Sequence, residues 1–153
     1  MIKTQLAAVS VISKVMAGSS LTAVLQEVWR TEAQLSPQQK GAIQDISYGV
    51  LRFYGQLEAI VGGLLKKALD QQCVHYLLLV SLYQLNYTKA QPHAIVDQAV
   101  SASRALAKGR GMQGLVNAVL RNFIRQREYW LGKAAEQDIG RYSYPQWWID
   151  KVR

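Results

Sequence analysis

The amino-acid sequence predicts an all-α fold, a helical bundle with a buried central helix, in a chain of 153 residues. Apolar side chains recur every three or four residues along most of the chain, which is the spacing of one helix face. Each of the three prolines stands where a helix can begin, and no alternating apolar and polar pattern indicates a strand. Half of the residues are apolar and 18% are charged, so the chain can bury a core and is neither disordered nor fibrous.

The first half of the chain predicts four helices. The apolar residues of the first segment have helical spacing, and the segment ends at Gly18. Ser36 is expected to cap the third helix, because Pro37 needs no amide hydrogen there and Gln39 completes a capping box. Gly55 is expected to bend or break the chain before the fourth helix. The predicted segments are about 4–17, about 21–31, Ser36 through Leu51, and Leu57 to Leu65.

The second half of the chain contains the predicted central helix. Residues 73–87 are apolar on nearly all sides, which is typical of a helix buried in the middle of a bundle. A buried strand is the competing interpretation of such a stretch, but its length favours a helix. The following segments are a helix from Pro92 through Ala102, the loop Lys108–Gly114, a helix from Leu115 to Ile124 and a further helix start at Pro145.

Positive charge is concentrated towards the C-terminus. The net charge is +8, of which residues 104–153 contribute +6 and residues 1–103 only +2. Asn117, Arg121 and Arg125 are four residues apart and share one helix face, from which guanidinium groups can bind phosphates. A solvated helix face is the competing interpretation of each residue alone. Residues 104–133 together contain seven basic side chains and a single acid, Glu128, and this imbalance favours nucleic acid. The predicted RNA-contacting residues are Lys3, Lys14, Arg104, Lys108, Arg110, Arg121, Arg125 and Arg127.

Residues 109–114 match the pattern G-x-G-x-x-G of dinucleotide-binding loops. That chemistry requires a strand before the glycines, and a helical segment precedes them here. We therefore interpret the motif as a helix–helix loop and predict no cofactor-binding residue. Its glycines would still let backbone amides and Arg110 approach a phosphate.

The chain has few groups suited to catalysis or metal binding. Cys73 is the only cysteine, so an internal disulfide is impossible and a reducing, cytoplasmic location is expected. One cysteine and two histidines, His75 and His93, argue against a structural zinc site. Neither histidine has a nucleophile beside it, so no catalytic residue and no metal ligand are predicted. The apolar stretch Val74–Tyr87 is too short and too polar to span a bilayer, so no membrane partner is expected.

Residues 141–153 are rich in aromatic side chains. Such rings can stack on RNA bases, but we favour packing on this domain or on a missing neighbouring one. Because the chain stops just inside the helix expected after Pro145, we expect a fragment of a longer protein. The predicted organisation is a helical domain over residues 1–140 and the start of a linker over residues 141–153.

Three stretches together resemble the NusB-type helical RNA-binding domain in their order and spacing. They are I-S-Y-G-V-L-R at 46–52, H-Y-L-L-L-V-S-L-Y-Q-L at 75–85 and G-L-V-N-A-V-L-R at 114–121, with P-H-A-I-V-D at 92–97. The resemblance covers about residues 4–130, and the third stretch is its most specific part. At the start of the first helix this chain has Lys3 and Thr4 where the family often has an arginine.

The resemblance implies one of two functions. This domain occurs as a free-standing transcription antitermination factor, which binds transcript RNA together with a ribosomal protein. It also occurs as the N-terminal module of small-subunit ribosomal RNA cytosine-5 methyltransferases of the Sun/Fmu family. The pattern L-Y-Q-L-x-Y-T at 82–88, P-H-A at 92–94 and the tail at 141–148 resemble the methyltransferases more closely.

A methyltransferase context implies that this fragment is not itself catalytic. In that family the cysteine nucleophile and S-adenosylmethionine belong to a Rossmann-like domain, for which this chain has no strand–glycine loop–helix unit. We therefore expect S-adenosylmethionine only in the parent enzyme, with ribosomal RNA and the enzyme's own catalytic domain as partners. An interaction module that merely packs on that catalytic domain is a third alternative, which the residues leave open.

Overall fold

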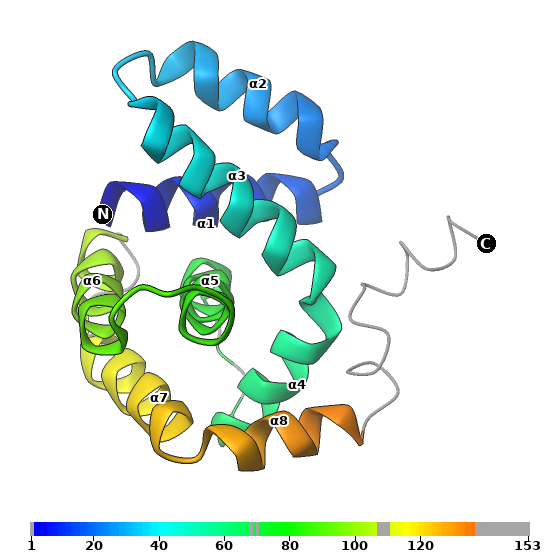
Figure 1. Ribbon diagram of the computed structural model, residues 1–153, viewed down its shortest axis with the longest axis vertical. Coiled ribbons are helices and arrows are strands. Elements are labelled where there is room, and N and C mark those ends of the chain that lie inside the picture. Colours follow the sequence, from blue (N-terminus) through cyan, green and yellow to red (C-terminus); the bar gives the residue numbers. More distant parts are fainter. Residues whose placement is uncertain (1, 68, 70, 107–110, 137–153) are drawn as a thin grey trace.

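The computed structural model describes residues 2–67, 69, 71–106 and 111–136, and all regular secondary structure in these ranges is α-helical. The predicted all-α fold is therefore confirmed for this part of the chain. Figure 1 shows a ring of helices around α5, which is seen end-on, with α2 outside the ring. The helices are α1 (Ile2–Met16), α2 (Leu21–Thr31), α3 (Pro37–Arg52), α4 (Tyr54–Leu64), α5 (Gln72–Tyr87), α6 (Pro92–Ala105), α7 (Gln113–Arg125) and α8 (Arg127–Ala135).

The predicted central helix is α5, and the structure confirms its burial. It packs against α1, α3, α4, α6 and α7. A helix with neighbours on every side needs apolar residues on every face, and the leucines of α5 meet this need. Each fully buried leucine contributes about 1.5–3 kcal/mol relative to an exposed one, so α5 organises the core of the bundle. Its leucines without exposed surface are Leu77, Leu78, Leu79 and Leu82.

A pair of glutamines joins α1 to α5 inside this core. Gln5 has no exposed surface, and its Nε2 donates to Oε1 of Gln84 at 2.8 Å. A buried amide costs free energy unless it is hydrogen-bonded, so this bond offsets part of the desolvation of the two glutamines, while Oε1 of Gln5 has no partner among the described residues. The apolar pattern of the sequence did not predict this pair, because it does not tell which polar residues face the core.

Local signals set the start of α3, whereas a tertiary contact accompanies its end. The side chain of Ser36 accepts from the amide of Gln39 at 3.1 Å, and the reciprocal bond measures 2.9 Å, which confirms the predicted capping box. The break between α3 and α4 falls at Phe53, so the expected break at Gly55 is wrong. Gly55 is buried inside α4, while the ring of Phe53 stacks on Tyr87 of α5.

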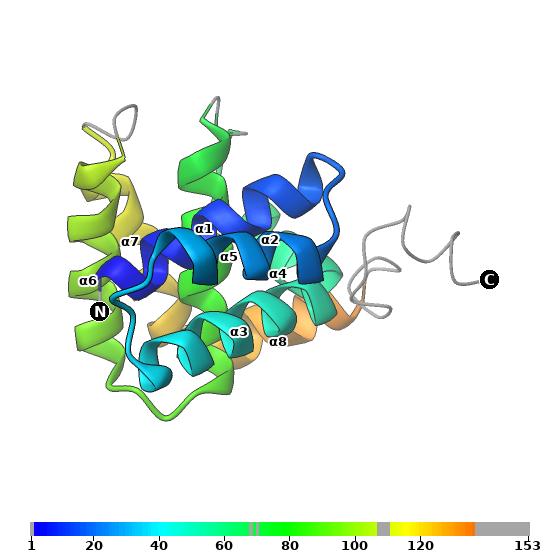
Figure 2. The ribbon, with the colours of Figure 1, turned by 90° about the horizontal axis from the view of Figure 1, so that it is seen from above.

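The last helices are the α6–α7 hairpin and α8. Figure 2 shows α6 and α7 side by side, and they pack against each other. No apolar stripe in the sequence predicts α8, because Ala134 is its only buried residue. Its packing on α4 holds it in place: a Cβ atom on Gly63 would lie 2.6 Å from the ring of Trp130, so this approach requires glycine.

Candidate nucleic-acid interface

The α7 helix separates an apolar face from a basic face. Its buried residues, such as Leu120 and Phe123, fix the helix on the core. Arg121 and Arg125 are exposed on another face, and Nε of Arg121 donates to Oδ1 of Asn117 at 2.8 Å. A guanidinium group carries five N–H donors, so this bond positions Arg121 and leaves most of its donors for a phosphate. The structure therefore brings together the three residues that were predicted to share a helix face.

Arg127 is a further exposed arginine, at the start of α8. Its Nε donates to Oδ1 of Asn86 at 3.0 Å, and its Nη2 donates to the carbonyl oxygen of Asn86 at 3.1 Å. These bonds fix Arg127 against the C-terminal end of α5, while its side chain stays exposed. We refer to Arg121 and Arg125 together as the α7 arginine cluster.

Two further predicted contacts lie outside the cluster: Arg104 is part of the α6–α7 hairpin, and Lys3 lies beside it. Arg104 is exposed in the last turn of α6, at the end of the hairpin where α7 begins. Arg121 lies about 12 Å further along the axis of α7, by the rise of an α-helix. Lys3 is exposed at the start of α1, which both ribbon views place beside α6.

Two other groups of predicted contacts do not join the cluster. Arg30 lowers the pKa of Glu27 on α2 through a hydrogen bond and its charge, and the charge of Lys14 adds to this effect. Lys14 is therefore close enough to Glu27 for its charge to act there, and it lies at the opposite end of α1 from Lys3. Lys108 and Arg110 lie outside the described residues, as does the proposed linker over residues 141–153.

The positive charge of the cluster is not neutralised within the described part of the chain. The ion pairs found there join Arg30 to Glu27 and His75 to Glu58, so neither involves the cluster. Glu128, the acid nearest to it in sequence, is exposed. A polyanion would therefore meet exposed guanidinium groups without having to displace a carboxylate.

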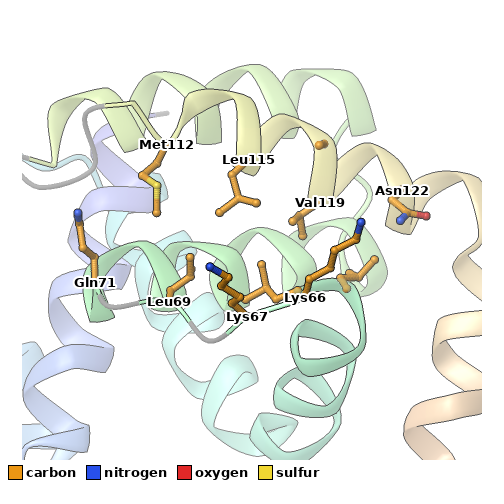
Figure 3. A pocket seen from close by; sticks show the side chains of 11 residues that line it. Lys66, Lys67, Leu69, Gln71, Met112, Leu115, Val119 and Asn122 are labelled. Atoms are coloured by element: carbon orange, nitrogen blue, oxygen red, sulfur yellow. The ribbon is translucent and has the colours of Figure 1, made fainter.

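A groove that sequence reasoning missed lies between α7 and the segment that joins α4 to α5. It has a volume of about 530 Å³, and Figure 3 shows Lys66 and Lys67 on one side and residues of α7 on the other. Asn122 lines it as a polar group of α7. The signal in the sequence was the apolar spacing of Leu64, Leu65 and Leu69 at and beyond the end of α4, but the sequence alone does not show that these residues lie opposite α7. The apolar lining residues include Leu64, Leu65, Leu69, Met112, Leu115 and Val119.

The histidines occupy different environments. His75 is half-buried on α5 and contacts the carboxylate of Glu58 on α4. Burial first, and the charge of Glu58 second, raise the pKa of both Tyr54 and Tyr76 beside this pair. His75 therefore takes part in the packing of α5 on α4, whereas His93 is exposed in the first turn of α6.

Two further observations concern the described ranges alone. In these ranges, no group of three or more histidine, cysteine, aspartate or glutamate side chains lies close enough together to hold a metal ion. Within the same ranges, no helix is both long enough and apolar enough to cross a membrane.

The described residues form an all-α domain, and the candidate interface on its surface is positively charged. Residues 2–125 match the NusB family, and the chain belongs to this family. This match confirms the family that was identified from the motifs at 46–52, 75–85 and 114–121.

The similar proteins include ribosomal RNA small subunit methyltransferase B from several bacteria. The protein of Serratia proteamaculans (strain 568) is 35% identical over 150 residues, which cover 97% of this chain and 34% of the relative. The protein of Vibrio vulnificus (strain YJ016) is 37% identical over 132 residues, covering 85% and 30%. That of Vibrio cholerae serotype O1 is 39% identical over 124 residues, covering 80% and 28%. The chain therefore spans about a third of the length of these relatives, and the predicted similarity to the methyltransferases is confirmed.

Proposed function

We propose that this chain is the non-catalytic RNA-binding domain of an S-adenosylmethionine-dependent 16S ribosomal RNA (cytosine-C5) methyltransferase. The observation that carries the proposal is the match of almost the whole chain to a part of proteins named ribosomal RNA small subunit methyltransferase B. In this proposal the remainder of the enzyme binds S-adenosylmethionine and performs the methyl transfer in the bacterial cytoplasm. The partners of this domain are ribosomal RNA and the catalytic domain.

The α7 arginine cluster supplies the chemistry for holding RNA. Exposed guanidinium groups form bidentate, charge-assisted hydrogen bonds with phosphate oxygens. Contacts of this kind fix the position of an RNA without reading its sequence. Arg104 and Lys3 extend the same electrostatic attraction along the α6–α7 hairpin and the start of α1. The domain thereby helps to present a cytosine, while the catalytic domain selects and modifies it.

Steady-state methylation of 16S ribosomal RNA by a longer protein that contains this chain tests the proposal. Arg121→Ala with Arg125→Ala should raise the KM for RNA, on the order of tenfold, and leave kcat nearly unchanged, because the lost contacts hold substrate and transition state equally. Arg30→Ala is the matched control, since Arg30 is an exposed arginine on α2, outside the predicted interface. An unchanged KM in the double variant would contradict the proposal and favour a module that only packs on the catalytic domain.

A further inference from the structure

A second surface with potential for RNA recognition lies where α3 and α5 end. The rings of Phe53 and Tyr87 stack with their centroids 4.2 Å apart and their planes 10° apart. Tyr83 stacks on Tyr87 at 5.4 Å and 27°, and Cζ of Arg52 lies 5.4 Å from the centroid of Phe53. Planar groups from two helices thus form a continuous column. The predicted RNA contacts do not include any of its members.

The floor of this surface is rigid. Gly49 lets the ring of Tyr83 lie directly on the backbone of α3, since a Cβ atom there would be 2.1 Å from Cε1 of Tyr83. The hydroxyl of Tyr83 donates to the carboxylate of Asp45 at 3.3 Å, and the hydroxyl of Tyr87 donates to Oε1 of Gln56. These contacts hold the aromatic rings before any ligand arrives, so binding would not have to order them.

The rim of this surface is exposed and positively charged. Tyr48 is 49% exposed and Tyr87 is 38% exposed. Tyr48 and Arg52 are four residues apart, so they are neighbours on the same face of α3. Arg127, held on Asn86, lies beside Tyr87 because Asn86 and Tyr87 are adjacent at the end of α5.

The charges around Tyr87 support this arrangement. Burial raises the pKa of the Tyr87 hydroxyl, whereas hydrogen bonds with Gln56 and Asn86 and the charges of Arg127 and Arg52 act in the opposite direction. Both guanidinium groups therefore lie near one phenol, although they come from α8 and α3. The described acids nearby are Asp45, bound to Tyr83, and Glu128, which follows Arg127 in sequence.

We propose that the exposed side chains of Tyr48 and Arg52 form a stacking surface for unpaired RNA bases, with Arg127 as a nearby phosphate contact. Tyr87 lies inside the column, where Phe53 and Tyr83 stack on its ring, and it supports this surface without stacking on a base itself. The inference rests on the proposed RNA-binding function and adds a mode of recognition that the α7 arginine cluster does not provide. Aromatic rings and guanidinium planes stack on bases of any sequence, and arginine also binds the adjoining phosphates. Arg127 follows Arg125 by two residues and is held on Asn86 next to Tyr87, so a single strand bound at the cluster can continue past Arg127 onto the stacking surface. A base-paired strand cannot use it, because its bases are already stacked within a duplex.

Binding of three RNA probes to the full 153-residue chain tests this inference. The probes are an unpaired oligoribonucleotide, a duplex of the same length and an oligomer of the same backbone that lacks bases. Tyr48→Ala and Arg52→Ala should each weaken binding of the unpaired probe by about tenfold, within the range measured for base stacking. Tyr48→Ala should leave binding of the baseless probe unchanged, and Tyr48→Phe should restore binding of the unpaired probe.

Tyr129→Ala is the matched control. Tyr129 is 54% exposed and lies two residues after Arg127, so it points away from Arg127 around α8. This variant should bind all three probes as the parent chain does. If the parent binds RNA but Tyr48→Ala and Arg52→Ala bind the unpaired probe equally well, the stacking surface is refuted and the proposed function stands. If the parent chain binds none of the probes, both proposals fail.

Discussion

Replacing Gly49 with alanine tests how closely α3 packs on α5. An added Cβ atom would lie 2.1 Å from both Cε1 and Cζ of Tyr83, far inside van der Waals contact. Tyr83 is only 6% exposed, is stacked on Tyr87 and donates to Asp45, so its ring cannot move without losing these contacts. Forcing extra volume into such a site costs about 1–3 kcal/mol.

The helix propensity of alanine works against this cost. Alanine stabilises a helix interior by about 0.5–1 kcal/mol relative to glycine. We therefore expect Gly49→Ala to lower the free energy of unfolding by about 1–2 kcal/mol in urea titrations followed by circular dichroism. Removing the ring should abolish the penalty, so in a Tyr83→Ala background the same change should become neutral or stabilising.

Gly41 offers a control within the same helix. It is exposed on α3, and an added Cβ atom would have nothing within 4 Å. Gly41→Ala should therefore raise the free energy of unfolding by about 0.5–1 kcal/mol. The close packing would be refuted if Gly49→Ala stabilised the protein as much as Gly41→Ala does.

Three further predictions concern the core, the buried Tyr83 and the binding of S-adenosylmethionine. Leu79→Ala should cost about 2–5 kcal/mol in urea unfolding, whereas Ile124→Ala, at a side chain 39% exposed, should cost less than about 1 kcal/mol; equal costs would contradict the central position of α5. Burial, followed by the charge of Asp45, raises the pKa of Tyr83 to about 12, so its contribution to stability is intact below pH 10 and is lost as the pH rises towards 12. The parent should therefore lose about 1.4 kcal/mol more stability than Tyr83→Phe between pH 8 and pH 11, and equal losses would show that Tyr83 ionises normally. Calorimetric titration of the 153-residue chain with S-adenosylmethionine should give no binding, and stoichiometric binding would overturn our interpretation of the glycine loop.

Local signals in the sequence were sufficient for much of the fold. The capping box at Ser36 depends on residues within one turn, and a helix that is apolar on all sides can only be stable when it is buried. The common face of Asn117, Arg121 and Arg125 follows from the helical repeat, so this part of the candidate interface was also predictable.

Contacts between distant segments were not predictable in the same way. Arg127 was selected for its charge, but its bond to Asn86 joins residues 41 positions apart. The stack of Phe53 on Tyr87 likewise depends on how α3 and α5 pack. The helix α8 was missed because packing on α4, and not an apolar stripe, holds it.

The salt dependence of RNA binding by the 153-residue chain tests the central claim most directly. If the α7 arginine cluster binds phosphates, the logarithm of the binding constant should fall with the logarithm of salt concentration, with a slope of roughly −0.7 for each phosphate neutralised on single strands. Arg121→Ala with Arg125→Ala should flatten this slope by about one to two units and leave the circular dichroism spectrum unchanged, whereas Arg30→Ala should keep the parent slope. If the double variant binds a ribosomal RNA hairpin with the parent's affinity and slope across the salt series, the basic face of α7 is only a solvated surface and the account is contradicted.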